Sequence, residues 1–182
     1  MKNRIIIIFL ILAAIFCSGS YDYEVRSLFI SYQPNVDRLE TMFKTYIPPQ
    51  KGIMFTKVPR GLIISVDEKM FFNEGEARIK ESSLIILDTI CVVLNRLSNY
   101  CIIEDHTEDN DLTNSYYREN WELSIARAGN IVQYMSAYCK IPADKLFALG
   151  YGEYMPFRDN VAPKNGMDSR IDFVILEYEA MR

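Results

Sequence analysis

The sequence predicts a two-layer α/β sandwich in which two long helices cover one face of a sheet. Two observations support this fold class. Strand-like runs alternate with two helical segments between residues 52 and 177, and both segments carry an apolar side that needs a sheet to bury it. The chain has 182 residues, of which 49% are hydrophobic and 24% are charged. This composition suits one folded domain with short additions.

The N-terminal segment, residues 1–20, has the order of an export signal. Lys2 and Arg4 precede an apolar run at residues 5–16, and small residues follow it. We therefore expect the protein to leave the cytoplasm. The run is shorter than the roughly 20 residues that a membrane-spanning helix needs. An uncleaved membrane anchor and acylation of Cys17 stay open as alternatives.

Charge and cysteine content exclude several kinds of site. Without residues 1–20 the net charge at pH 7 falls from -4 to -6, because that segment holds two basic residues and no acid. An acidic protein is a poor candidate for nucleic acid, which is not an expected partner. Cys91, Cys101 and Cys139 are predicted to be buried thiols, with one disulfide pair as the alternative. No cysteine or histidine spacing indicates zinc, and neither a metal nor a cofactor is expected.

The N-terminal part of the mature chain, residues 21–50, is predicted to be a tether with a short helix at 36–46. Asn35 is the candidate cap of this helix, and the two prolines at 48–49 end it. The folded domain is expected at residues 51–182.

The domain is expected to open with a hairpin, because two strand-like runs at 52–58 and 61–66 flank a Pro-Arg-Gly turn signal. Periodicity then predicts the remaining elements in this order: a helix at 82–97, a short strand at 100–104, a helix at 120–138, a strand at 146–152 and a last strand at 170–177.

The second long helix is predicted to have two stripes. The apolar stripe, which should face the sheet, consists of Trp121, Ile125, Ala128, Val132 and Met135. A polar stripe beside it consists of Asn120, Ser124 and Arg127, so Arg127 is expected on the side turned away from the deepest core.

An acid-rich turn beginning at Asp105 leads into this helix. If the turn folds back, a carboxylate of Glu108 or Asp109 and the guanidinium of Arg127 face one shallow pocket. Such a pocket suits a zwitterionic ligand, since the acid can bind an ammonium group and the arginine a carboxylate. An ordinary surface salt bridge, worth at most about 1 kcal/mol, stays open as the alternative.

Catalysis and calcium binding are weaker interpretations of the same turn. His106 is the only histidine, and no nucleophile motif accompanies it, so no catalytic residue is expected. The acids Asp105, Glu108, Asp109 and Asp111 offer the oxygen ligands that calcium uses. Their spacing does not match an EF-hand loop, and solvated acids are the favoured interpretation.

Four blocks of the sequence carry a family resemblance: IIEDHTED, NWELSIARA, KIPADKLFALGYGEYMPFRDN and DSRIDFVI. In order and spacing they resemble the peptidoglycan-binding domain of the OmpA/MotB family over roughly residues 61–177, and NWELS and GYGE are closer to the MotB side. The resemblance implies a β-α-β-α-β-β sandwich with a mixed sheet. It also implies a periplasmic protein that is not an enzyme and that binds the diamino acid of the peptidoglycan stem peptide without covalent bonds. Association with the outer membrane stays open.

The same resemblance implies which residues contact the ligand. The family's acid falls on Glu108 and its arginine on Arg127, and the remaining expected ligand-binding residues are Asn120, Leu123, Asp105, Thr107, Asp109 and Arg170. The sequence departs from the family pattern at several of these points. Asp105 replaces a glycine, which would strain a turn that needs positive φ, and Glu108 replaces an aspartate. Asp168 and Ser169 replace an asparagine and an arginine.

Two functions from different classes follow. The first is anchoring of an envelope component to the cell wall through peptidoglycan. The second is a structural or assembly role, in which the pocket has decayed and residues 21–50 dock on another envelope protein.

Overall fold

A computed structural model of the chain describes residues 34–48, 50–107, 112, 116–154, 167 and 169–179. The chain divides into two units, Met1–Pro34 and Asn35–Arg182, and the elements below belong to the second. The predicted export signal, Glu108, Asp109 and Asp168 lie outside the described residues, so the predictions made for them are not tested. Within the described part, every helix is too short or too polar to cross a membrane.

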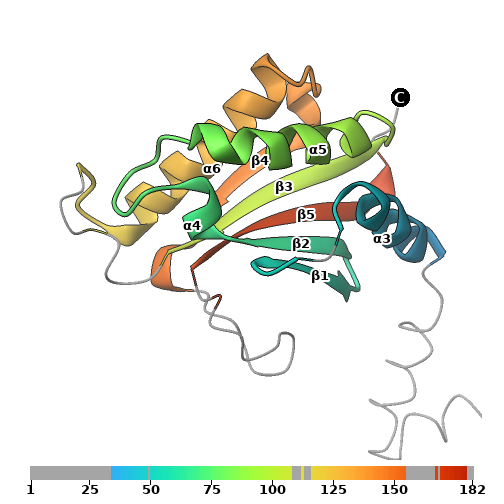
Figure 1. Ribbon diagram of the computed structural model, residues 1–182, viewed down its shortest axis with the longest axis horizontal. Coiled ribbons are helices and arrows are strands. Elements are labelled where there is room, and N and C mark those ends of the chain that lie inside the picture. Colours follow the sequence, from blue (N-terminus) through green and yellow to red (C-terminus); the bar gives the residue numbers. More distant parts are fainter. Residues whose placement is uncertain are drawn as a thin grey trace, which may run out of the picture. The chain divides into compact units, whose positions relative to one another are not determined.

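The sheet has five strands in the spatial order β1-β2-β5-β3-β4 (Figure 1). The strands are β1 Ile53–Val58, β2 Gly61–Asp67, β3 Asn99–His106, β4 Leu146–Gly150 and β5 Arg170–Glu179. Strand β1 pairs antiparallel with β2, β2 with β5, and β5 with β3, whereas β3 and β4 pair parallel. This mixed sheet confirms the predicted fold class.

Within the described residues the sheet is accompanied by α3 Pro34–Tyr46, α4 Glu68–Phe71, α5 Leu84–Leu94 and α6 Asn120–Ala137. The long helices α5 and α6 lie on the same face of the sheet (Figure 1). Helix α3 begins at Pro34, so Asn35 lies inside its first turn and the prediction that Asn35 caps the helix is wrong. Proline suits this position because it has no N–H to leave unpaired and its φ is already helical.

One hydrophobic core joins these helices to the sheet. It contains Phe43 of α3, Ile90 of α5, Ile131 of α6, and Ile103 and Phe173 of the central strands, all with 0% exposed surface. Side chains alternate between the two faces of a strand, so this set fixes which strand residues face the helices. On β3 and β5 the residues of the helix-covered face include Ile103, Ile171 and Phe173.

The buried side of α6 differs from the predicted apolar stripe. Trp121 and Ile125 are 48% and 38% exposed, whereas the buried set comprises Asn120, Leu123, Ser124, Arg127, Ala128, Ile131 and Met135. The predicted polar stripe therefore faces inward. Its burial is tolerable because its polar groups have partners on neighbouring elements, which removes most of the cost of leaving water.

Strand β3 is longer than predicted and includes two residues that the sequence placed in a turn. Asp105 pairs with Gly150 of β4 on one side and with Ile171 of β5 on the other, and His106 pairs with Arg170. The acid-rich turn therefore begins after His106. Position 105 lies in the sheet because a central strand is held by hydrogen bonds on both edges, which overrides the low strand preference of aspartate.

Candidate ligand-binding site

Arg127 is a fully buried charged group of the predicted site, with 0% of its surface exposed. Its Nη1 forms an ion pair with Glu68 Oε1 at 2.6 Å. Its Nε donates to the carbonyl of Glu76 at 2.8 Å, and its Nη2 donates to the carbonyl of Asn73 at 3.1 Å. The guanidinium also lies 5.1 Å from the centre of the Phe72 ring. The guanidinium of Arg127 thus joins helix α6 to α4 and to the loop after α4.

This arrangement corrects the predicted position of Arg127. The loop that follows α4 lies over the guanidinium, so the side chain is buried rather than turned away from the core. A charge that leaves water needs an opposite charge and further hydrogen bonds to be stable there, and Glu68 with the two carbonyls supplies both. A ligand carboxylate that reached Arg127 would share the guanidinium with Glu68.

Asp105 and Thr107 form a hydrogen-bonded pair at the end of β3. Thr107 Oγ1 donates to Asp105 Oδ1 at 2.8 Å, and the exposed fractions of the two residues are 0% and 2%. Among the described residues other than glycine, Lys140 alone has positive φ. Asp105 therefore occupies the family's glycine position without the backbone strain expected from the sequence.

The start of α6 is tied to the turn after β4. Ser124 Oγ donates to the carbonyl of Asp105 at 3.3 Å and accepts from Gly152 N at 3.0 Å. Asn120 Nδ2 donates to Glu153 Oε2 at 3.2 Å. Nothing among the described residues hydrogen-bonds to Asn120 Oδ1, which is buried. Leu123, with 0% exposure, packs inside and can shape the site but cannot present a surface to a ligand without rearrangement.

Arg170 lies on the other face of the sheet. It pairs in register with His106, one residue away from the pair formed by Asp105 and Ile171. Because neighbouring side chains of a strand point to opposite faces, Arg170 lies on the face away from α6 and its Arg127. Its Nε donates to Asp172 Oδ2 at 3.0 Å. The structure does not bring the two arginines into one pocket.

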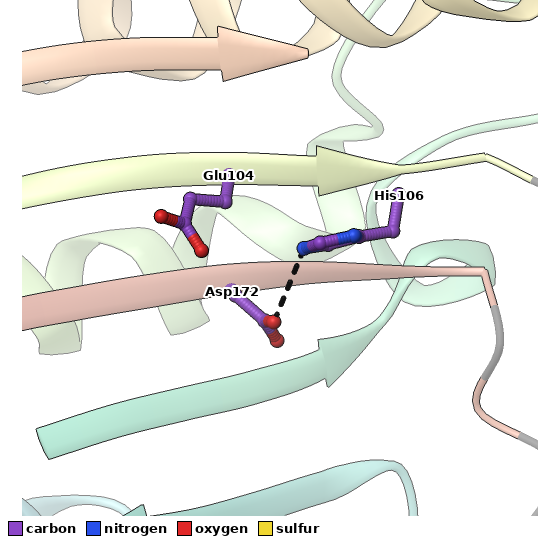
Figure 2. A group of neighbouring side chains, drawn as sticks. All are labelled: Glu104, His106 and Asp172. Carbon is purple, nitrogen blue, oxygen red and sulfur yellow. Dashed lines mark ion pairs between the residues drawn. The ribbon is translucent and has the colours of Figure 1, made fainter. Parts of the chain in front are cut away.

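That second face carries a buried polar cluster of Glu104, His106 and Asp172 (Figure 2). His106 Nε2 lies 3.3 Å from Asp172 Oδ2. Burial opposes ionisation of Asp172, but the hydrogen bond from His106 and the charge of Arg170 outweigh it, and the pKa of this carboxyl lies below its usual value.

The geometry of this cluster would allow three ligands to a metal, since its ligand atoms lie within 4.8 Å of one another. However, Arg60 donates from both terminal nitrogens to the two oxygens of Glu104 at 2.9 Å, and Arg170 holds Asp172. Two guanidinium groups already neutralise the two carboxylates, and a divalent cation would have to approach both of them. The arrangement is that of an ion-pair network.

Sequence reasoning missed the acid that holds Arg127. Glu68 directly follows β2 in a helix of only four residues, which is too short to show helical periodicity. Its exposed fraction is 3%, and a buried carboxylate of this kind requires a cation. The available signal was the position of an acid directly after an apolar strand.

Known proteins resemble this chain in sequence over much of its length. A model of the OmpA family matches residues 71–169. The protein YtxE of Bacillus subtilis (strain 168), whose role is uncharacterized, is 32% identical over 143 residues, which are 76% of this chain and 59% of YtxE. Motility protein B of the same strain is 33% identical over 119 residues, 64% of this chain and 45% of that protein. The chain thus spans between 45% and 59% of the length of these relatives.

Solved structures share the fold. A MotB-like protein from Desulfovibrio vulgaris has a TM-score of 0.68 at 22% identity, covering 85% of this chain and 96% of that one. The cell wall anchor of the T6SS from Pseudomonas aeruginosa has a TM-score of 0.65 at 16% identity, covering 80% and 99%. The periplasmic domain of Helicobacter pylori MotB has a TM-score of 0.61 at 18% identity, covering 69% and 80%. At these identities the likeness is one of fold.

Proposed function

This chain belongs to the OmpA family, whose OmpA/MotB-like domains are known for peptidoglycan association and anchoring. From that premise we propose that it binds the peptidoglycan stem peptide without covalent bonds and so anchors an envelope component, or itself, to the cell wall. Domains of this family are generally non-catalytic, and the proposal includes no chemical step. Attachment to the outer membrane and docking of residues 21–50 on an envelope protein are further parts of the proposal.

The observation that carries the proposal is the fixed position of Arg127. An ion pair with Glu68 and two hydrogen bonds to loop carbonyls hold its guanidinium in one orientation. An arginine normally loses considerable side-chain freedom when it binds a carboxylate, and that loss weakens binding. A side chain already ordered by the fold avoids most of it. This supports a role for Arg127 in holding the ligand carboxylate, a role that requires the loop over its fully buried guanidinium to move aside.

The opposite charge of the diamino acid needs an acid, and Glu108 is the proposed one. It follows Thr107, which comes directly after β3 and whose N–H donates to the carbonyl of Gly152, a residue packed against the start of α6. The start of a helix favours carboxylates, because its first N–H groups are not used within the helix. Asn120 is the first residue of α6, and its Oδ1 is an acceptor that a ligand ammonium or amide could use.

The alternative is a structural or assembly role without binding to the cell wall. A specific observation favours it: Glu68 lies 2.6 Å from Arg127 and neutralises the guanidinium in the absence of any ligand. In this alternative Arg127 serves only to join α6, α4 and the loop after it.

Co-sedimentation of the full chain with purified sacculi separates these functions. Glu108→Gln keeps the size of the side chain and removes its charge. We expect it to weaken binding by about tenfold or more, because a charge-assisted hydrogen bond is worth about 1.5–3 kcal/mol. Glu81→Gln is the matched control, since Glu81 is an exposed acid in a 3-10 turn before α5. Wild type that stays in the supernatant would favour the structural role, and Glu108→Gln that pellets as wild type does would reject Glu108 as a ligand-binding residue.

A further inference from the structure

A groove of about 450 Å³ lies on the outer side of α6, against the chain segment that follows the Arg127 loop. Its polar and aromatic lining consists of Arg78, Tyr117, Asn130, Gln133, Tyr134 and Tyr138. The volume falls within the range of about 300–1,000 Å³ that is usual for small-molecule sites. None of these residues belongs to the stem-peptide site described above.

The groove continues directly from the loop that holds Arg127. Arg127 bonds to the carbonyl of Glu76, and Asn130 Nδ2 donates to the carbonyl of the next residue, Ala77, at 2.7 Å. Asn130, Tyr134 and Tyr138 then follow Arg127 at intervals of three or four residues, which places them along one side of α6. At about 1.5 Å per residue the stripe runs roughly 16 Å from Arg127 to Tyr138.

Two of the tyrosines form a fixed aromatic platform. The rings of Tyr134 and Tyr138 stack with their centres 5.1 Å apart and an angle of 27° between their planes. Tyr134 is anchored because its hydroxyl donates to Asp88 Oδ1 at 2.8 Å. Tyr138 is 74% exposed, although an aromatic ring of this size is usually at least partly buried. An exposed ring held by a stacked neighbour is a contact surface ready for a partner.

The chemistry of the lining fits a sugar. A pyranose ring has one face of C–H groups that packs on an aromatic ring, and its hydroxyl and acetamido groups need donors and acceptors at the edge. The side-chain amides of Asn130 and Gln133 can supply both kinds of group, and the guanidinium of Arg78 adds donors. An uncharged ligand also avoids the electrostatic repulsion that an acidic chain of net charge -4 would exert on an anion.

We propose that this groove binds an N-acetylated amino sugar of the glycan strand of the cell wall. The inference rests on the proposed function, because the stem peptide links that strand to the site at Arg127. In peptidoglycan two residues, one of them linked through its side-chain carboxyl, and a lactyl ether separate the diamino acid from the sugar, and together they span on the order of 10–14 Å. This reach is shorter than the stripe along α6, so a sugar attached to a peptide at Arg127 arrives beside Asn130 and Tyr134.

Calorimetric titration of the full chain with two separate probes tests the inference. The first probe is glycan strand from which an amidase has removed the stem peptides and whose freed lactyl carboxylates have been converted to amides, so that it stays uncharged. The second is the free stem tripeptide containing the diamino acid. Loss of one aromatic contact is worth about 0.5–1.5 kcal/mol. Tyr138→Ala should therefore weaken binding of the glycan by about three- to tenfold and leave binding of the tripeptide unchanged. Gln133→Ala should also weaken binding of the glycan, and this exposed substitution within a helix does not threaten folding.

Tyr154→Ala is the matched control, because Tyr154 has 73% exposure, close to that of Tyr138, and lies outside the groove. It should change neither affinity. The inference is overturned if the wild type does not bind stripped glycan, if Tyr138→Ala binds it as wild type does, or if Tyr138→Ala weakens binding of the tripeptide instead. If the glycan binds and the tripeptide does not, the sugar site stands and the stem-peptide site fails.

Discussion

Arg127 and Glu68 are two charges that the fold removes from water together, with exposed fractions of 0% and 3%. Neither could be buried alone, since an isolated charge in the interior costs several kcal/mol. The pair links the first turns of α6 to the short helix after β2, so it bears on stability as well as on ligand binding.

Glu68→Gln removes the negative partner and leaves the guanidinium buried. We expect the free energy of unfolding to fall by about 3–5 kcal/mol, the usual cost of breaking a buried ion pair from one side. Urea unfolding followed by circular dichroism measures this change. Glu81→Gln, an exposed acid, should stay within about 0.5 kcal/mol of wild type. A loss below 1 kcal/mol for Glu68→Gln would show that water or another group compensates for the missing carboxylate.

The functional roles that the family motif assigns to residues of α6 stay predictions, whereas the side of the helix on which these residues lie was predicted wrongly. The family motif identified Arg127 and Asn120, and the structure places both on the buried side of the helix. Periodicity assigned that side to Trp121 and Ile125, which are partly exposed. Counting apolar residues fails here because Ser124 and Arg127 are satisfied by partners from distant segments, and no local pattern reports those partners.

At the scale of elements, the two glycines of GYGE explain how α6 and β4 pack. A Cβ placed on Gly150 would lie 2.3 Å from Ile125 N and 2.6 Å from Ser124 Oγ. The backbone of α6 therefore lies directly against the end of β4. Gly152, with φ of +54°, brings the next turn against Trp121 N. The motifs NWELS and GYGE belong to two sides of one contact, which a single sequence cannot reveal.

Gly150→Ala and Gly129→Ala test this contact with the same chemical change. Gly150→Ala must displace backbone atoms of α6, so we expect it to destabilise the protein by at least about 1–3 kcal/mol. Gly129 lies within α6, and nothing lies within 4 Å of a Cβ added there. Gly129→Ala should stabilise the protein by about 0.5–1 kcal/mol, because alanine is the better helix former. Thermal unfolding measures whether the midpoint temperature falls for Gly150→Ala and rises for Gly129→Ala. Equal changes in the two midpoints would contradict the close approach of α6 to β4.

The hairpin, both long helices and the succession of strands along the chain were predictable from the sequence because each depends on a local pattern. The ends of strands were less predictable. Asp105 and His106 extend β3 because β4 and β5 flank it, and those neighbours lie more than 40 residues away in the sequence. The packing of the loop after α4 over Arg127 was missed for the same reason.

At the scale of the whole molecule, α3 shares its core with the sheet. Val36, Leu39, Phe43 and Ile47 are at most 3% exposed and belong to the same cluster as residues of α5, α6 and the strands. The sequence placed this helix in a tether, because its apolar spacing could not show what it packs against. The proposed division of the chain at residue 50 stays a prediction, but the side chains of α3 contribute to the stability of the domain.

Phe43→Ala should therefore destabilise regions far from α3 as well. Removing a fully buried phenylalanine costs about 3–5 kcal/mol, and in a cooperative unit this loss appears at every probe. Trp121 is the single tryptophan and lies in α6, so its fluorescence reports unfolding at a distant element. We expect Phe43→Ala to lower the urea midpoint equally by Trp121 fluorescence and by circular dichroism. Ile85→Ala, at a site with 72% exposure, should move neither. A circular dichroism transition that shifts while the fluorescence transition does not would mean that α3 unfolds independently of the sheet.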